Sequence, residues 1–344
     1  MSSVFSPDLY KKIIKEFGYD DSFFEGFTKS ITNFSASDLQ KIFLCHTGLY
    51  AFDAAPSDQK VVTTGLGLSG EPHIGTLSQI YRLSLFQKSG YKVQLVLGDL
   101  DAYNGKSVSI GRVNELAERY EQFIKRTNLL SASAKTIVRR QYDATDVLRV
   151  AYLLGRFVDD EDFKDANEHI HEFYAAKGKV DLDMTYRRKL SLMLMLADFF
   201  AIGQKYPHVL VMLGVDEHQY VRVGQNLAEK VSQEESGLTP VQIASIYTPI
   251  IRGLDGYPKM SKSFPGSGID LTMSPELIRE KVFSQIRHES DITEDPVFQM
   301  VAAIGVDTPL SFDEIEKAYH SDTTWDTIKE LLTRRITRFA EAWE

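Results

Sequence analysis

Residues 61–76 read Val61-Val62-Thr63-Thr64-Gly65-Leu66-Gly67-Leu68-Ser69-Gly70-Glu71-Pro72-His73-Ile74-Gly75-Thr76. The β-branched residues at the start predict a buried strand over 60–64. Glycine, serine and proline follow within a few positions, which indicates a turn. Apolar residues then recur at helical spacing and predict a helix over 74–88. A strand, a turn and a helix in this order are the repeating unit of an α/β fold.

The same alternation continues along the chain. Short apolar or β-branched runs at 92–97, 136–138 and 208–213 predict further strands, and a helix is expected over 113–125. The run 208–213 is nearly all apolar, as expected of a strand that is buried on both faces of a parallel sheet. Strands separated by helices predict a doubly wound, parallel-sheet α/β domain of the Rossmann-like type.

The pattern divides the 344 residues into three parts. We expect an N-terminal helical extension over 1–55 and a Rossmann-like catalytic domain over 56–272. A charged helical insertion interrupts the catalytic domain around 145–185. A C-terminal helical domain is expected over 273–344.

Local signals place individual helices in the two outer parts. The N-terminal extension has candidate helices at 7–17 and near 37–43. In the C-terminal part, Ser274-Pro275-Glu276 combines an N-cap serine, a first-turn proline and an acid, which is a typical helix start. The last helix is expected over 325–343 and carries several basic residues, namely Lys329, Arg334, Arg335 and Arg338.

Composition limits the class of protein. Hydrophobic residues make up 43% of the chain, and no run approaches the roughly 18 apolar residues of a membrane span. Cys45 is the only cysteine, and the N-terminus lacks a secretory pattern, so we expect a cytoplasmic protein. The formal net charge of −9 argues against a general nucleic-acid binder and mildly against tRNA binding, although a local basic patch would still allow it.

The glycines after the first strand fit two kinds of nucleotide site. Gly65, Gly67 and Gly70 have the spacing of a dinucleotide-binding fingerprint. That fingerprint expects the helix to begin among the glycines and an acid about 20 residues later. Glu71-Pro72 interrupts the first feature, and residues 90–95 contain no acid. We therefore disfavour a dehydrogenase.

The other interpretation centres on His73 and Gly75. A helix N-terminus offers free N–H groups and the positive end of a dipole, and a histidine there can donate a hydrogen bond to a phosphate oxygen. Gly75 would let adenine or ribose approach the helix backbone, because it has no Cβ. The alternative is that His73 merely caps the helix.

A second basic motif follows much later in the chain. Residues 259–263 read Lys259-Met260-Ser261-Lys262-Ser263, in a loop rich in glycine and proline. Two lysines on a mobile loop can stabilise the charge that develops on phosphates during nucleotidyl transfer. An exposed basic turn with no chemical role is the alternative.

Together these motifs resemble those of the class I aminoacyl-tRNA synthetases. Their HIGH signature matches His73-Ile74-Gly75, with Thr76 departing at the fourth place, and their KMSKS signature matches Lys259–Ser263 at every position. The tryptophanyl and tyrosyl branch is most similar, with the tryptophanyl enzymes first. Its lead-in resembles Gly65-x-x-x-Ser69-Gly70, and its G-x-D-Q element resembles Gly214-Val215-Asp216-Glu217.

The resemblance implies a reaction and a set of sites. ATP, accompanied by Mg²⁺, would react at its α-phosphate with an amino-acid carboxylate, and the aminoacyl group would then pass to tRNA. His73, Lys259 and Lys262 would stabilise phosphate charge. The other ATP-binding positions would be Gly67, Gly75, Thr76, Gly214, Asp216, Met260, Ser261 and Ser263. The amino acid would be held by Thr63, Gly65, Met195, Asp198 and Glu217. The branch also implies a homodimer.

Three departures bear on the substrate. Ser191 stands where the branch usually has an aromatic residue, and Thr63 stands where tyrosyl enzymes usually have a tyrosine. Glu217 replaces the usual glutamine and adds a negative charge. We expect tryptophan as substrate, with tyrosine second. The rivals are a paralogue that passes its activated amino acid to an acceptor other than tRNA, and an interaction protein with an inactive site.

The sequence does not predict a metal site. His169-x-His171 lies in the charged insertion, but its spacing suits a strand better than a helix, and no further ligands cluster near it.

Overall fold

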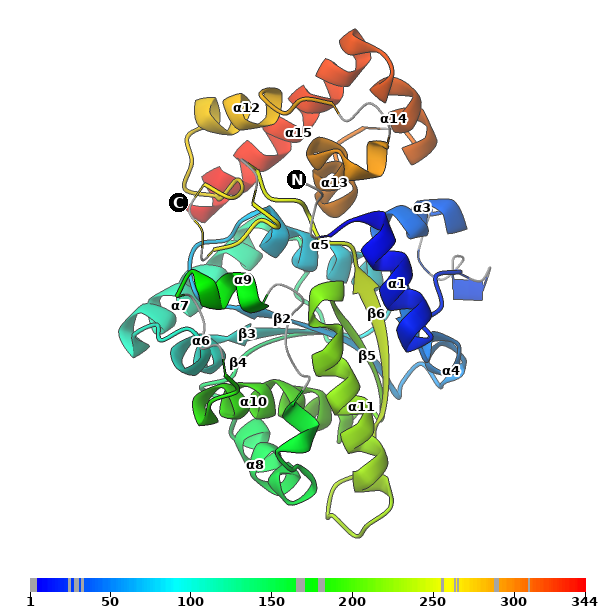
Figure 1. Ribbon diagram of the computed structural model, residues 1–344, viewed down its shortest axis with the longest axis vertical. Coiled ribbons are helices and arrows are strands. Elements are labelled where there is room, and N and C mark those ends of the chain that lie inside the picture. Colours follow the sequence, from blue (N-terminus) through cyan, green and yellow to red (C-terminus); the bar gives the residue numbers. More distant parts are fainter. Residues whose placement is uncertain are drawn as a thin grey trace.

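The computed structural model describes residues 5–23, 26–27, 31, 34–164, 171–178, 183–254, 257–262, 264, 266–287, 291–308 and 310–344. In this part of the chain, one six-stranded sheet lies between layers of helices (Figure 1). The strand order is β1-β6-β5-β2-β3-β4. The strands are β1 (Cys45–Thr47), β2 (Lys60–Gly67), β3 (Val93–Gly98), β4 (Thr136–Arg140), β5 (His208–Gly214) and β6 (Gln242–Thr248).

All neighbouring strands are parallel except β1, which runs antiparallel to β6. The order reverses between β2 and β5: the chain builds outward from β2 to β4, then returns to place β5 on the other side of β2. In open α/β sheets, ligands bind beside the carboxyl ends of the strands at such a switch point. The predicted doubly wound, Rossmann-like fold is confirmed.

Alternation along the strands builds a hydrophobic core on each face of the sheet. Val62 and Leu210 point into one core, whereas Val61 and Val209 point into the other. All of β5 except His208 is buried, as the apolar run predicted. Burial on both faces explains why β-branched and other apolar residues dominate the central strands.

The helices divide between the two faces. Residues of α3 (Ala36–Ile42), α4 (Leu49–Ala54), α5 (Ile74–Lys88) and α7 (Ile110–Thr127) pack in the first core. Residues of α1 (Pro7–Phe17), α8 (Thr145–Leu154), α10 (Tyr186–Gly203) and α11 (His218–Ser232) pack in the second. The short helix α6 (Asp99–Gly105) follows β3, and α9 (His171–Ala176) lies in the expected insertion. Single 3₁₀ turns occupy Gly155–Phe157, Glu161–Phe163, Val215–Glu217 and Ile292–Glu294.

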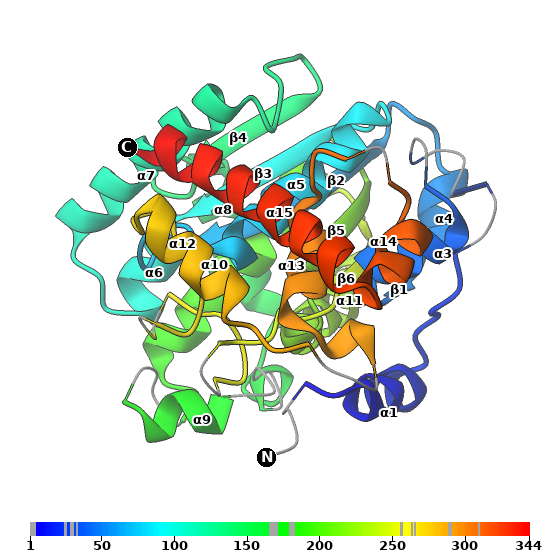
Figure 2. The same ribbon diagram turned by 90° about the horizontal axis from the view of Figure 1, so that it is seen from above.

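The C-terminal helices gather at one end of the molecule, at the top of Figure 1. They are α12 (Pro275–Phe283), α13 (Pro296–Ile304), α14 (Phe312–Tyr319) and α15 (Asp322–Trp343). Seen from above, α15 crosses this end of the molecule, where it packs against α12, α14 and α7 (Figure 2). The C-terminal part was predicted to be helical, and all its described elements are helices.

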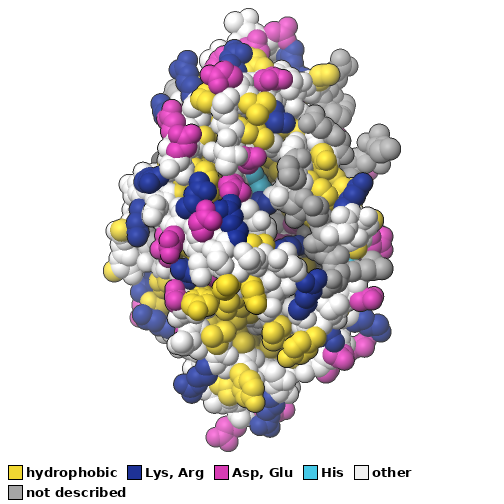
Figure 3. Space-filling model, turned by 90° about the vertical axis from the view of Figure 1, so that its left-hand side faces the viewer, with side chains coloured by type: hydrophobic (Ala, Val, Ile, Leu, Met, Phe, Trp, Pro, Cys, Tyr) yellow, Lys and Arg dark blue, Asp and Glu magenta, His cyan; other side chains and the backbone are white. Residues whose placement is uncertain are grey.

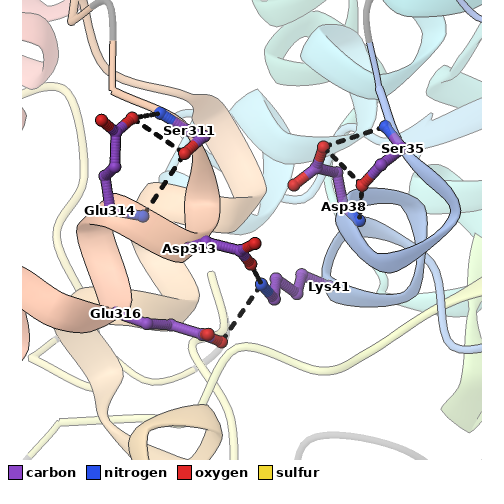
Figure 4. A network of polar contacts seen from close by, with 7 residues as sticks. All are labelled: Ser35, Asp38, Lys41, Ser311, Asp313, Glu314 and Glu316. Atoms are coloured by element: carbon purple, nitrogen blue, oxygen red, sulfur yellow. Dashed lines mark hydrogen bonds and ion pairs between the residues drawn. The ribbon is translucent and has the colours of Figure 1, made fainter.

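The two terminal parts contact each other directly through a polar network (Figure 4). Lys41 Nζ on α3 lies 3.0 Å from Asp313 Oδ1 and 3.2 Å from Glu316 Oε1 on α14. Capping boxes begin both helices: Ser35 pairs with Asp38 and Ser311 pairs with Glu314. This contact joins α3 to α14.

Several element bounds follow the sequence prediction closely. Helices α1 and α5 have the predicted ends, because Ser6 caps α1 and His73 caps α5. Ser274 caps α12 through Leu277 N–H, as its signature predicted. Within the expected N-terminal helical extension, however, Cys45–Thr47 forms edge strand β1. The three-part domain division remains a prediction. In the described part of the chain, no helix is long and apolar enough to cross a membrane.

Candidate active site

A cavity of about 240 Å³ opens at the carboxyl ends of β2 and β5, at the switch point of the sheet. Its walls come from the turn after β2, the start of α5, the turn after β5 and the loop at 259–262. The cavity therefore joins segments that lie far apart in the sequence. Its lining includes twelve of the predicted site residues, namely Gly65, Gly67, His73, Gly75, Thr76, Gly214, Asp216, Glu217, Lys259, Met260, Ser261 and Lys262.

Four predicted residues do not line this cavity or cannot be placed. Thr63, Met195 and Asp198 lie outside its lining. Ser263 lies outside the described residues.

His73 is the N-cap of α5, and its side chain makes the cap. Nδ1 accepts a hydrogen bond from Gly75 N–H at 2.9 Å. Because a backbone N–H can only donate, the proton of the neutral ring must be on Nε2. Burial first, and then the charges of Lys262 and Lys259, lower the pKa of His73 to about 3. The ring is therefore neutral at physiological pH and presents Nε2–H as a donor, so capping and phosphate binding are compatible.

Thr76 and Gly75 both support this arrangement. The Thr76 hydroxyl faces His73 N–H at 3.5 Å, which completes a capping box. A Cβ on Gly75 would lie 2.6 Å from Cε1 of the His73 ring, closer than real Cβ contacts come. We expected Gly75 to admit adenosine. The structure adds an internal reason for glycine at this position, which is the room that the imidazole needs.

Backbone hydrogen bonds bring the two motifs together. Ile74 N–H donates to Ile269 O at 3.1 Å, and Leu271 N–H donates to Pro72 O at 2.9 Å. The segment that follows the lysine loop is thus paired with the start of α5. This pairing positions the lysines over the cavity.

Each lysine has a partner within the cavity. Lys259 Nζ donates to Asp216 Oδ2 at 2.5 Å, and Lys262 Nζ donates to Gly67 O at 2.7 Å. Burial lowers the pKa of Lys262 to about 7, although Glu71 opposes the shift. A phosphate entering here would therefore meet one lysine that is already ion-paired and one whose ammonium is poorly solvated.

One of the predicted amino-acid residues, Asp198, belongs to a buried polar group outside the cavity lining. Asp198, which is 3% exposed, accepts a hydrogen bond from Gln141 Nε2 at 2.8 Å through Oδ2. Its Oδ1 and the hydroxyl of Ser191 have no hydrogen-bond partner among the described residues. Burial raises the pKa of Asp198 to about 7, and Asp101 contributes to the shift. Buried polar atoms are almost always satisfied, so these two are candidates for a substrate contact.

The positions of Thr63 and Met195 say less about a contact with the amino-acid substrate. The Thr63 hydroxyl accepts a hydrogen bond from Gln94 Nε2 at 3.1 Å and is fully buried. Met195 on α10 is half-buried and packs against the second core. Its position fits ordinary packing as well as a substrate contact.

Sequence reasoning missed several residues of this region. Lys106 and Tyr174 line the cavity, as does the segment 248–251 at the end of β6. The Tyr174 hydroxyl donates to Ser261 Oγ at 2.8 Å and so connects α9 with the lysine loop. Nothing in the charged insertion distinguished Tyr174. Gln141 did carry a signal, because it lies shortly after the strand predicted at 136–138, and ligand-binding side chains gather at the carboxyl ends of parallel strands.

The described residues contain no group of three histidine, cysteine, aspartate or glutamate side chains placed to hold a metal. His169 lies outside these residues. His171 Nε2 lies 3.3 Å from Arg188 Nη1, and such a guanidinium would repel a cation.

Comparison with known proteins supports the resemblance. The family model for class I tRNA synthetases of the tryptophan (W) and tyrosine (Y) type matches residues 57–340. The tyrosine–tRNA ligase of Methanocaldococcus jannaschii is 24% identical over 279 residues, which are 80% of this chain and 81% of that protein. The tryptophan–tRNA ligase of Aeropyrum pernix is 27% identical over 235 residues, which are 67% of this chain but only 58% of that protein.

Solved structures show the same fold. The crystal structure of tryptophanyl-tRNA synthetase from Aeropyrum pernix has a TM-score of 0.77 at 21% identity, over 98% of this chain and 92% of that one. Tyrosyl-tRNA synthetase from Archaeoglobus fulgidus, complexed with L-tyrosine, has a TM-score of 0.70 at 16% identity, over 89% and 97%. The chain belongs to the class I aminoacyl-tRNA synthetases, in the group that contains the tryptophan and tyrosine enzymes. Enzymes of this class use ATP.

Proposed function

We propose that this protein activates an aromatic amino acid with ATP, tryptophan first and tyrosine second, and transfers it to tRNA. The observation that carries the proposal is the shared cavity of His73, Lys259 and Lys262 at the switch point of the sheet. Capping of α5 accounts for His73 alone and does not require two lysines to converge beside it. Their convergence suits a triphosphate.

In this proposal the amino-acid carboxylate attacks the α-phosphorus of ATP, a P–O bond to the carboxylate forms, and pyrophosphate leaves. His73 Nε2–H donates to a phosphate oxygen, while Lys259 and Lys262 stabilise the charge on the leaving group. No general base is needed, because the attacking carboxylate is already ionised. Positioning and electrostatics supply the rate.

ATP would be bound by the residues that line the cavity. Asp216 would bind ribose hydroxyls, and because it now accepts a hydrogen bond from Lys259, Lys259 would first turn toward phosphate. Thr76, Met260, Ser261 and Ser263 are proposed as further contacts. Mg²⁺ would accompany ATP through phosphate oxygens and water, as that ion usually does.

The proposal of tryptophan rests on the polar group around Asp198. The open Oδ1 of Asp198 can accept from an indole N–H, which is only a donor. Thr63 offers no phenol of the kind that tyrosyl enzymes use at this place. A tyrosine hydroxyl could also donate to Asp198, and relatives of both kinds match the chain, so tyrosine remains the second candidate. Gly65 and Glu217 would lie near the α-amino group.

Transfer to tRNA is proposed over transfer to another acceptor because of family membership. The basic residues of α15 offer it little support. Asp307 pairs with Arg335 at 2.9 Å and with Arg338 at 2.6 Å, and Lys329 is buried. This pairing keeps open the alternative of a paralogue with a different acceptor.

We also propose a cytoplasmic homodimer. Figure 3 shows hydrophobic side chains grouped on the face of the molecule that carries α6, α8 and α10. An exposed apolar group of this kind marks an interaction surface. The exposed apolar residues on and around these helices are Tyr103, Tyr142, Leu148, Tyr152, Tyr186 and Leu190.

The test is ATP–pyrophosphate exchange with each of the twenty amino acids, without tRNA. Exchange that depends on tryptophan alone would support the activation step and the pocket assignment. Exchange with tyrosine would favour the second candidate. Charging of total tRNA with the activating amino acid then separates a ligase from a paralogue with another acceptor.

A further inference from the structure

A second cavity, of about 320 Å³, lies behind the active site. Residues of α1, α3 and α13 line it, together with Arg82 of α5. Residues Pro249, Ile250 and Ile251 line both cavities, so the two spaces share a wall. The volume falls within the range of small-molecule sites. Most of the lining is apolar, with contributions from Phe5, Pro7, Ile14, Leu44, Phe298 and Ala302.

Arg82 is the unusual member of this lining. Its side chain is 1% exposed, and Nε has no hydrogen-bond partner. Arg82 makes no hydrogen bond or ion pair with any residue that the structure describes. Burial lowers the pKa of Arg82 only to about 9, so the guanidinium keeps its charge at neutral pH. A buried, unpaired cation is strongly unfavourable unless something neutralises it.

The other charges around the cavity do not fill this role. Lys41 is already bound by Asp313 and Glu316, as Figure 4 shows. Lys11 also lines the cavity, but it is exposed to solvent. Asp21 and Glu294 also line the cavity, but neither forms an ion pair with Arg82. Arg82 therefore supplies the one buried positive charge of the described lining that no acid offsets.

A second donor faces the same space. Tyr10 lines the cavity, and its oxygen accepts a hydrogen bond from Ile250 N–H at 3.0 Å. Burial raises the pKa of Tyr10, so the phenol keeps its proton. With its oxygen engaged as an acceptor, the hydroxyl can donate its proton to a ligand.

We propose that this second cavity binds a small organic monoanion, a carboxylate with an apolar body. The carboxylate accepts from the Arg82 guanidinium and the Tyr10 hydroxyl, and the apolar part contacts the hydrophobic walls. One buried cation without an ion-pair partner among the described residues matches one negative charge, whereas a phosphate dianion would bring an uncompensated charge into an apolar space. A planar carboxylate also fits the planar guanidinium fork.

The probe is 3-phenylpropionate, compared with its neutral isostere 3-phenylpropanamide. Binding is measured by isothermal titration calorimetry with saturating ATP, so that the first cavity is occupied. The wild-type protein should bind the acid at least about ten-fold more tightly than the amide, as expected for a charged hydrogen-bonded pair. Equal affinities for the two compounds, or no binding of either at millimolar concentration, would overturn the proposal.

Variants locate the site. Arg82→Met should abolish the preference for the acid, because it removes the buried charge. The variant should keep the fold, which thermal unfolding checks. Ile14→Trp should fill the cavity and exclude both compounds. Arg334→Met, which removes an exposed charge on α15, is the matched control and should change neither affinity. An undiminished preference for the acid in Arg82→Met would show that the anion binds elsewhere.

Discussion

The imidazole of His73 shows how one residue can serve the fold and the chemistry together. Its Nδ1 is used by the helix cap, which leaves Nε2–H as the donor for a phosphate oxygen in the proposed function. The low pKa near 3 means that the ring stays neutral throughout the physiological range. Sequence reasoning left capping and phosphate binding as alternatives because it could not assign the two ring nitrogens separately.

Gly75→Ala tests this arrangement. The added Cβ would approach the His73 ring at 2.6 Å and must displace it. We expect amino-acid-dependent ATP–pyrophosphate exchange to fall about 10²-fold, as for loss of one oriented hydrogen-bond donor. The free energy of unfolding should fall by about 1 kcal/mol, because the cap of α5 is lost. Gly111→Ala is the control, because a Cβ there meets nothing within 4 Å, and it should leave activity unchanged. Full activity in Gly75→Ala would contradict the assigned role of the ring.

Asp198 carries a pH dependence whose sign follows from its burial. Its pKa rises from 3.8 to about 7 on folding, so the native state binds the proton more tightly than the unfolded chain. The carboxyl therefore destabilises the protein progressively as pH rises from about 4 to 7 and costs nothing below that range. Asp198→Asn should raise the free energy of unfolding at pH 8 by on the order of a few kcal/mol, and by much less at pH 4.

Urea unfolding at the two pH values measures this effect. Gln141 occupies one oxygen of Asp198, so the asparagine variant loses the open acceptor. Its KM for the amino acid should rise about ten-fold while its KM for ATP stays the same. A stability change that is equal at both pH values would refute the raised pKa.

At the scale of elements, the lysine loop depends on a helix from another part of the chain. The Tyr174 hydroxyl on α9 donates to Ser261 Oγ, and Lys259 lies 5.4 Å from the centre of the Tyr174 ring. Tyr174→Phe keeps the ring and removes only the hydroxyl. The KM for ATP should rise several-fold with a smaller change in kcat, because the loop loses an anchor but no phosphate contact.

The KM for ATP of Tyr174→Phe is measured by ATP–pyrophosphate exchange at saturating amino acid and varied ATP concentration. Tyr152→Phe is the control, since Tyr152 is 88% exposed on α8. An unchanged KM for ATP in the Tyr174 variant would show that the contact with α9 does not position the loop.

Periodicity predicted the strongly patterned elements well and the weakly patterned ones poorly. Helices α1 and α5 begin at clear caps and carry regular apolar spacing, so their ends could be read from the sequence. Strand β1 has three residues and β6 begins with Gln242, so neither resembles the apolar run of β5. These strands form because partners across the sheet bury them, which local sequence does not encode.

At the scale of the whole molecule, the site was predictable where residue types form a short motif and not where tertiary packing assembles it. The two signature segments were found from their residue types alone. The backbone pairing of 72–74 with 269–271, the contact from Tyr174 and the Gln141–Asp198 pair arise only when distant segments meet. The same is true of the second cavity, whose lining comes from both ends of the chain.

The exposed apolar face leads to a prediction about assembly. Tyr152 and Tyr186 are 88% and 78% exposed. Replacing both with glutamate should convert a dimer into a monomer, because charges at an apolar interface cannot be desolvated cheaply. Sedimentation velocity measures the change, with Ile286→Glu as the control at a position that is 90% exposed on another part of the surface. A monomeric wild-type protein would contradict the prediction.

The most direct measurement of the central claim is mass spectrometry of the adenylate that the enzyme forms. The protein is incubated with ATP, Mg²⁺ and an equimolar mixture of the twenty amino acids, and the bound nucleotides are identified by mass. Our account predicts tryptophanyl adenylate in the wild-type protein and a strongly reduced amount in Lys259→Met. A non-aromatic adenylate, or none at all from active and folded protein, would contradict it.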